Sequence, residues 1–189
     1  MSDWLPVNSE KKLVRLLQNA YSGERAAAYA YRGHAASVSN LQEKTEIINI
    51  EKEEWEHRAC IKEMLFTLGS KPRISRELLM GFIGCVIYCF CRVGGWFNLF
   101  NFGWYMSMYG AGKLEQSNIN EYDVAARKAI QCNRQIFVAD LIHMAEIEWD
   151  HENYFRSKVL ESRWSKIIKP WTFPASREST RKNIEHLKS

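Results

Sequence analysis

The chain lacks the sequence pattern of a β-sheet. Alternating runs of β-branched and polar residues bounded by turn dipeptides, which mark strands and hairpins, do not occur in its 189 residues. Apolar residues instead recur at steps of three and four over long stretches, a spacing typical of amphipathic helices. We therefore expect an all-α chain whose length suits one hydrophobic core.

The chain also lacks a secretion signal and a zinc-binding cysteine pattern. Its N-terminal segment contains no apolar run of signal-peptide length and has an acidic residue, Asp3, near its start. The five cysteines are an odd number, and none has the spacing of a zinc knuckle. We expect a cytoplasmic protein with buried, reduced thiols.

Charge is almost absent from one internal segment, since Arg92 is the only charged residue between Glu77 and Lys113. The first apolar run, 78–91, has 14 residues, fewer than the roughly 20 that span a bilayer. The second run, 93–112, is long enough but contains several Gly and Asn residues. We expect a buried or interfacial helix here, and the segment would face the core, a membrane or a second copy of the chain in a homodimer.

The helical pattern predicts four long helices, an extra apolar helix and a short helix near the C-terminus. The first two bundle helices are expected at 9–37 and 40–68, and the apolar helix at 75–91. A third bundle helix follows a break at Gly94–Gly95 and continues through Glu115, and the fourth covers 123–160 with an interruption near Cys132. The short C-terminal helix is expected at 176–187. We expect a helical bundle over 1–160 and a basic extension over 161–189. Residues 156–189 contain nine Lys or Arg against three Glu. We favour a solvated face here over contact with a membrane or nucleic acid.

Two similar tetrapeptides carry the main functional signal. EWEH at Glu54–His57 returns as EWDH at Glu148–His151, and both pairs fall in the apolar stripe of a long helix. The same register places Glu24 and Glu115 inward on the other two bundle helices. Each bundle helix therefore contributes one core carboxylate, and two of them add a histidine three residues later.

Four buried carboxylates without compensation are costly, at several kcal/mol per ion, and the stripes offer too few Lys or Arg residues to balance them. Two metal ions would supply the missing charge. One Glu from each of two helices and a Glu-x-x-His from each of the others is the ligand set of di-iron and di-manganese bundles. A carboxylate-rich site with oxygen and nitrogen donors favours iron or manganese over thiolate-seeking metals. Of the two we expect iron, with manganese the lesser alternative.

Several further polar residues lie near these positions. Glu51 and Glu53 flank the inward register, and we interpret them as a solvated face from which either residue could support a metal ligand. Tyr122 either donates a hydrogen bond near the metals or fills the core. We do not expect His34 to be a ligand, because it lies about 15 Å of helix beyond Glu24. Asp140 and His143 repeat the carboxylate and imidazole spacing but are interpreted as a surface pair.

The stretch YSGERAAAYAYRG, which contains Glu24, together with Glu54-x-x-His57 and the apolar segment before Glu115, resembles the ferritin-like superfamily. Within it, the pattern is most similar to the demethoxyubiquinone hydroxylase family, over roughly residues 13–155. The resemblance implies a ferritin-like four-helix bundle with a dinuclear metal centre. It also implies that Glu24, Glu54, His57, Glu115, Glu148 and His151 hold two iron ions and form the catalytic centre, with Glu54 and Glu148 bridging. The sequence departs from the family around Glu115, where Glu121 precedes Tyr122 instead of a histidine.

The expected activity is therefore that of an O₂-dependent di-iron monooxygenase. Its substrate would be an apolar, quinone-like molecule, its electrons would come from an external reductant, and the apolar segment would allow peripheral membrane contact. The alternatives are a ferritin- or rubrerythrin-like protein that oxidises iron or scavenges peroxide, and a di-iron hydroxylase of another substrate. Nucleic acid is not an expected partner.

Overall fold

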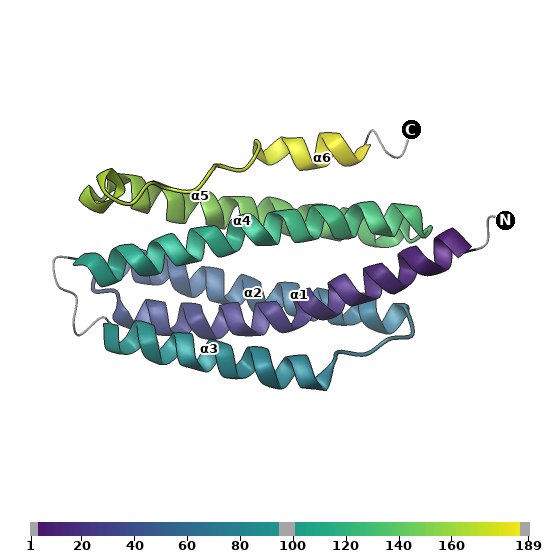
Figure 1. Cartoon of the computed structure of the whole chain (residues 1–189), viewed down its shortest axis with the longest axis horizontal. Coiled ribbons are helices and arrows are strands. Elements are labelled where there is room, and N and C mark those ends of the chain that lie inside the picture. Colours follow the sequence, from purple (N-terminus) through teal and green to yellow (C-terminus); the bar gives the residue numbers. More distant parts are fainter. Residues whose placement is uncertain (1–3, 95–100, 186–189) are drawn as a thin grey trace.

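The computed structural model describes residues 4–94 and 101–185, and within these ranges it contains helices and no strand. The elements are α1 (Trp4–Ser37), α2 (Leu41–Thr67), α3 (Ile74–Gly94), α4 (Phe102–Gln131), η2 (Gln135–Phe137), α5 (Val138–Glu161), η3 (Arg163–Lys166) and α6 (Arg177–Glu185). The hairpin α1–α2 packs against the hairpin α4–α5, while α3 and α6 lie on opposite outer sides (Figure 1). The expected all-α bundle, with an extra apolar helix and a short C-terminal helix, is confirmed.

The ends of α2 follow the sequence signals. The side chain of Asn40 caps the first turn, because its Oδ1 accepts hydrogen bonds from the backbone N–H groups of Gln42 and Glu43 at 2.9 and 3.0 Å. At the other end, Gly69 adopts a φ of 64°, a left-handed conformation that glycine tolerates best. The predicted range 40–68 is therefore confirmed.

Two predicted helix boundaries are wrong. The first helix begins at Trp4 rather than Ser9, and Pro6 is compatible with this start because the first turn needs no N–H from it. The third bundle helix continues to Gln131, so the fourth begins at Val138 rather than at residue 123. The break contains Asn133 with a φ of 59° and no Gly or Pro, which is why the sequence suggested only an interruption.

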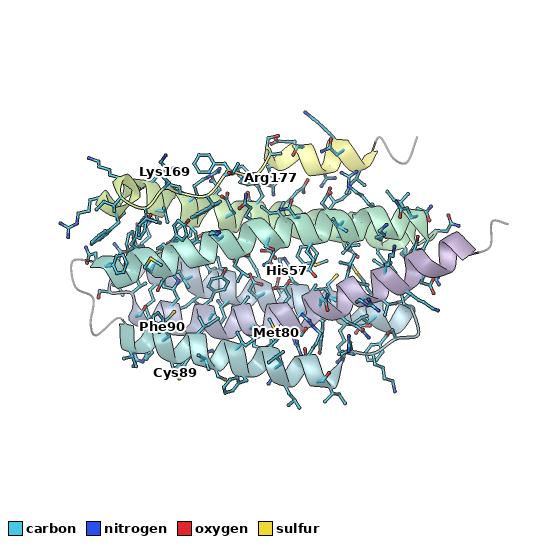
Figure 2. The ribbon with its side chains drawn as sticks, in the orientation of Figure 1. His57, Met80, Cys89, Phe90, Lys169 and Arg177 are labelled. Carbon is cyan, nitrogen blue, oxygen red and sulfur yellow. The ribbon has the colours of Figure 1, made fainter. Side chains whose placement is uncertain are left out.

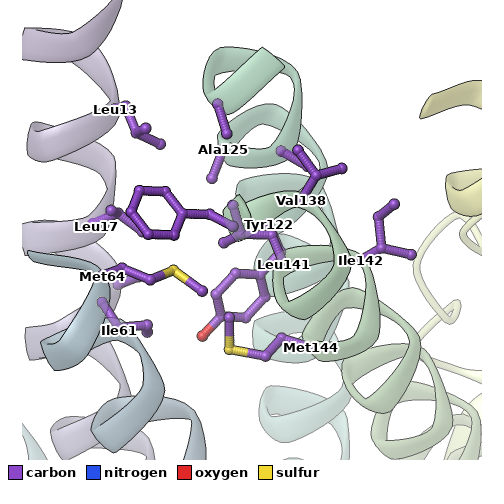
Figure 3. Close-up of a cluster of buried hydrophobic side chains, with 14 of the residues drawn as sticks. Leu13, Leu17, Ile61, Met64, Tyr122, Ala125, Val138, Leu141, Ile142 and Met144 are labelled. Atoms are coloured by element: carbon purple, nitrogen blue, oxygen red, sulfur yellow. The ribbon is translucent and has the colours of Figure 1, made fainter. Parts of the chain in front are cut away.

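The bundle core consists of two apolar clusters. One joins the N-terminal halves of α1 and α5 to the C-terminal halves of α2 and α4 and includes Leu17, Met64 and Leu141 (Figure 3). The other joins the opposite ends of the same helices and includes Tyr31, Ile50 and Phe155. On α1, α2, α4 and α5 alike, the predicted metal-binding residues lie between the two clusters in sequence.

Helix α3 packs closely on α1 through small residues. A Cβ added to Gly33 would lie 2.6 Å from the backbone of Tyr88, and one added to Gly84 would lie 2.9 Å from the backbone of Ala26. The outer face of α3 is apolar and exposed, and the prediction of buried thiols is wrong for Cys85 and Cys89, which lie on the exposed side. By length and composition alone α3 could cross a membrane, and only 17% of its most apolar window is buried.

The second apolar run of the sequence, 93–112, does not form a single helix. Helix α3 ends at Gly94 and α4 begins at Phe102. The break was predicted at Gly94–Gly95, and Gly95 lies outside the described residues. Helix α3 therefore carries the exposed apolar face of this segment, residues 102–112 belong to α4 of the bundle, and contact of α3 with a membrane stays a prediction.

The segment after α5 runs back along the bundle. The indole of Trp171 covers Gly112, whose added Cβ would lie 2.4 Å from the ring, and Ile184 of α6 is buried in the first cluster. Arg181 forms two hydrogen bonds of 2.8 Å with Glu146. Part of the basic charge of this segment is thus balanced by acids of α5, and the division of the chain at residue 160 stays a prediction.

Candidate metal centre

The structure brings all six predicted metal-binding side chains together in the middle of the bundle. Each is at most 4% exposed, and His57 lies in the interior between the two hairpins (Figure 2). The contributing residues are Glu24 from α1, Glu54 and His57 from α2, Glu115 from α4, and Glu148 and His151 from α5. The inward register deduced from the sequence is therefore confirmed at each of these positions.

The six side chains form two groups that share members. Glu24, Glu54, His57 and Glu148 make one group, and Glu54, Glu115, Glu148 and His151 make the other. Within each group, one donor atom per residue lies within 4.8 Å of the others. Each hairpin supplies three members of one group and a single carboxylate to the other. Glu54 and Glu148 occur in both groups, as expected of residues that bridge two ions.

The donor atoms converge without hydrogen-bonding to one another. His57 Nδ1 lies 3.0 Å from Glu148 Oε1, yet neither atom has a hydrogen-bond partner in suitable alignment within the described chain. Both carboxylate oxygens of Glu54, one oxygen of Glu24 and His151 Nδ1 are likewise buried and unpaired. Unpaired polar atoms in a core cost about 1–3 kcal/mol each, so protons or cations bound among them would stabilise this arrangement.

The donor set fits two divalent ions. Four carboxylates carry four negative charges, and two divalent cations balance them. Oxygen and nitrogen donors in this ratio suit iron or manganese. Among the residues whose burial the structure describes, no Lys or Arg is buried, so no buried positive side chain takes the place of the ions.

The electrostatics of the centre show the same deficit of positive charge. Burial and the neighbouring carboxylates raise the pKa of Glu24 and of Glu115 well above the ordinary value. Burial alone would lower the pKa of His57 and of His151, but the nearby carboxylates, Glu148 above all, outweigh it and raise both. Metal-free, the centre would therefore hold protons that cations must displace on binding.

Two tyrosines connect the hairpins at the centre. Tyr31 of α1 donates its hydroxyl to Glu115 of α4, and Tyr122 of α4 donates its hydroxyl to Glu24 of α1. Each tyrosine lies seven residues after the glutamate of its own helix and bonds the glutamate of the other. The hydrogen-bond role considered for Tyr122 is confirmed. The role of Tyr31 was missed, although its matching spacing from Glu24 was a usable signal.

Outside the two groups, one acid supports a predicted ligand. Glu53 Oε2 lies 2.6 Å from His151 Nε2, which leaves His151 Nδ1 directed at the centre, whereas Glu51 pairs with Arg32 at 2.7 Å instead. Of the two acids considered for this role, only Glu53 takes it. A carboxylate on the outer nitrogen fixes the tautomer and orientation of a ligating histidine.

The other two histidines in the described part of the chain, His34 and His143, lie outside the groups. His34 is buried but belongs to neither group, as expected, and Asp140 and His143 are both exposed, which agrees with their interpretation as a surface pair. Asn118, which the sequence analysis did not single out, donates a 2.9 Å hydrogen bond to Glu115 Oε2.

Fold and site together define a helical bundle with buried Glu and His groups able to hold metal ions. No family model matches the chain, and no solved structure matches it. One curated protein does, the 3-demethoxyubiquinol 3-hydroxylase of Francisella philomiragia, which is 34% identical over 67 residues. The match covers 35% of this chain and 32% of the length of that protein. The chain thus has a partial similarity to a hydroxylase, over about a third of each protein.

Proposed function

We propose that the chain is an O₂-dependent di-iron monooxygenase that hydroxylates an apolar, quinone-type molecule at a membrane surface. The observation that carries the proposal is the pair of donor groups that share Glu54 and Glu148. Two iron ions held there would supply the reduction of O₂ and the transfer of one oxygen atom to a C–H bond. Such a reaction needs two electrons and two protons to form the hydroxylated product and water, so an external reductant is required.

The residues around the centre would exclude water and fix the ligands. Apolar clusters close it on both sides along the bundle, and Tyr31, Tyr122, Asn118 and Glu53 hold three of the six ligands by hydrogen bonds. A quinone-type substrate is supported by the partial similarity to a protein whose name specifies demethoxyubiquinol.

The outer face of α3 supports docking on a membrane. Phe82 and Phe90 are 67% and 74% exposed, and they share this face with further exposed apolar residues. Lys71 and Arg73 precede the helix and Arg92 lies at its end, and all three are exposed. Since α3 packs on α1 along its length (Figure 1), we propose that it lies along the surface of an anionic membrane. A homodimer through the same face is the competing outcome, and sedimentation with and without vesicles separates the two.

The first test is metal content with an optical spectrum recorded anaerobically and after O₂ addition. Wild-type protein is compared with two variants, Glu148→Gln and Glu152→Gln. Glu152→Gln is the control, because Glu152 is a buried acid one turn from Glu148 that accepts a 2.8 Å hydrogen bond from Trp171. We expect about two irons per chain and an O₂-dependent transient in the wild type and the control, and the loss of both in Glu148→Gln. Iron that binds equally in all three proteins would refute the site. Iron oxidation without substrate hydroxylation would favour the ferritin-like alternative.

A further inference from the structure

An apolar cavity of about 350 Å³ lies between α1, α3 and α4. Its volume is at the lower end of the range for small-molecule sites, roughly 300–1,000 Å³, and suits a substituted aromatic ring. Ile87, Phe90, Met106 and Leu114 line it and are themselves at least 40% exposed. The opening therefore lies beside the apolar face of α3 (Figure 2 labels Phe90), where a hydrocarbon tail could continue outward.

One polar group in this cavity has no partner. His34 lines the cavity and is 2% exposed, and its Nε2 makes no hydrogen bond with the part of the chain that the structure describes. The imidazole stacks on Phe155, with ring centroids 6.1 Å apart and planes inclined by 20°. A fixed, buried nitrogen without a hydrogen bond is unfavourable, and an occupant of the cavity with a matching polar group would supply that bond.

The protonation state of His34 narrows the choice of that group. Burial lowers the pKa of His34 to about 4, so the ring is neutral near pH 7. The Nε2 of a neutral imidazole donates or accepts, depending on the tautomer, and a hydroxyl can do either. A ring hydroxyl is therefore a group that satisfies both tautomers.

One residue connects the cavity to the candidate metal centre. Tyr31 lines it, and its hydroxyl is bonded to Glu115. His34 lies three residues further along α1, about 4.5 Å of helix rise. A ring held at His34 would thus lie beside the tyrosine that contacts a predicted metal ligand.

We propose that His34 is a positioning residue that binds a ring hydroxyl of the substrate and so sets which ring carbon faces the metal centre. The inference rests on the proposed function and names its substrate class as a hydroxylated aromatic ring, a phenol or hydroquinone, with an apolar tail. His34 would act through substrate orientation and would take no part in holding metal.

The test measures binding of two probes, 4-pentylphenol and pentylbenzene, to the full chain by equilibrium dialysis. We expect the ratio of phenol affinity to hydrocarbon affinity to be about tenfold lower in His34→Phe and His34→Leu than in the wild type. A tenfold change corresponds to about 1.4 kcal/mol, the free energy of about one hydrogen bond. Hydrocarbon affinity itself should stay the same or rise. His34→Gln, which keeps a polar group, should retain part of the preference, and the exposed His143→Gln should match the wild type.

A second variant locates the probes. Gly110 lines the cavity and an added Cβ there meets nothing within 4 Å, so Gly110→Leu should fill the space without displacing the backbone. We expect both probes to bind at least tenfold more weakly to it, with metal content unchanged. An unchanged affinity ratio in the His34 variants, or probe binding unaffected by Gly110→Leu, would overturn the inference. Absence of iron with the ratio shift intact would instead reject the proposed oxygenase and leave the binding role of His34 standing.

Discussion

Glu53 offers a sharp test of how the metal centre is supported. Its carboxylate lies 2.6 Å from His151 Nε2, and the hydrogen bond to His151 lowers the pKa of Glu53 despite partial burial, so the pair holds His151 Nδ1 toward the centre. Loss of such a partner typically weakens metal binding about 10–100-fold. Because the side chain of Glu53 is 42% exposed, water screens the interaction. We therefore expect the lower end of that range for Glu53→Ala, about tenfold or 1.4 kcal/mol.

The assay is competition between the protein and a chelator of known affinity during anaerobic Fe²⁺ loading. Only the ion bound in the group that contains His151 should weaken, so the titration should separate into a tight and a weaker step. Glu53→Gln keeps an acceptor without the charge and should show a smaller loss. Glu56→Gln, one turn away on the exposed side of α2, is the matched control. Two ions bound with wild-type affinity in Glu53→Ala would refute the supporting role.

Three further predictions concern stability. Gly33→Ala should destabilise the fold by about 1–3 kcal/mol, since its added Cβ would lie 2.6 Å from the backbone of Tyr88. Gly23→Ala is the control, because its added Cβ meets nothing within 4 Å, and it should stabilise the fold by about 0.5–1 kcal/mol. Urea unfolding measures both free energies, and equal effects would contradict the close packing of α3 on α1. Tyr122→Phe should cost the metal-free chain about 1–3 kcal/mol by leaving Glu24 without its hydroxyl partner, while Tyr109→Phe, at an exposed 3.4 Å bond, should cost under about 1 kcal/mol. Burial lowers the pKa of His34 from its ordinary 6.5 to about 4 in the folded chain. Between these pH values the unfolded chain binds the extra proton, so the free energy of unfolding should fall by up to about 3 kcal/mol as the pH drops from 6.5 to 4. His34→Phe should lose this part of the pH dependence, and identical pH profiles for the variant and the wild type would refute the prediction.

The sequence predicted the burial of the candidate metal ligands better than the chain breaks around them. Glu24, Glu54, Glu115 and Glu148 could be placed inward because the 3.6-residue period fixes which positions share a helix face. The break after Gln131 depends on Asn133 in a left-handed conformation, which few sequence signals mark.

Contacts between helices could not be deduced from periodicity. The period places Tyr31 inward but does not say that Glu115 of another helix meets it, and an acid beside the stripe, such as Glu53, is indistinguishable from a solvated one until α5 is placed. The burial of His34 beside a cavity likewise arises from the packing of α3, α4 and α5 around α1, which no local pattern encodes.

If metal ions bind as proposed, the division of ligands between the hairpins would couple metal loading to folding. An isolated hairpin would hold three donors of one group and lack the carboxylate that completes it. Ions that bind only the docked hairpins would stabilise the chain by about 2.7 kcal/mol at a concentration one hundred times their Kd. The unfolding midpoint would then rise with metal supply, and chains made without iron would unfold more readily and be degraded sooner.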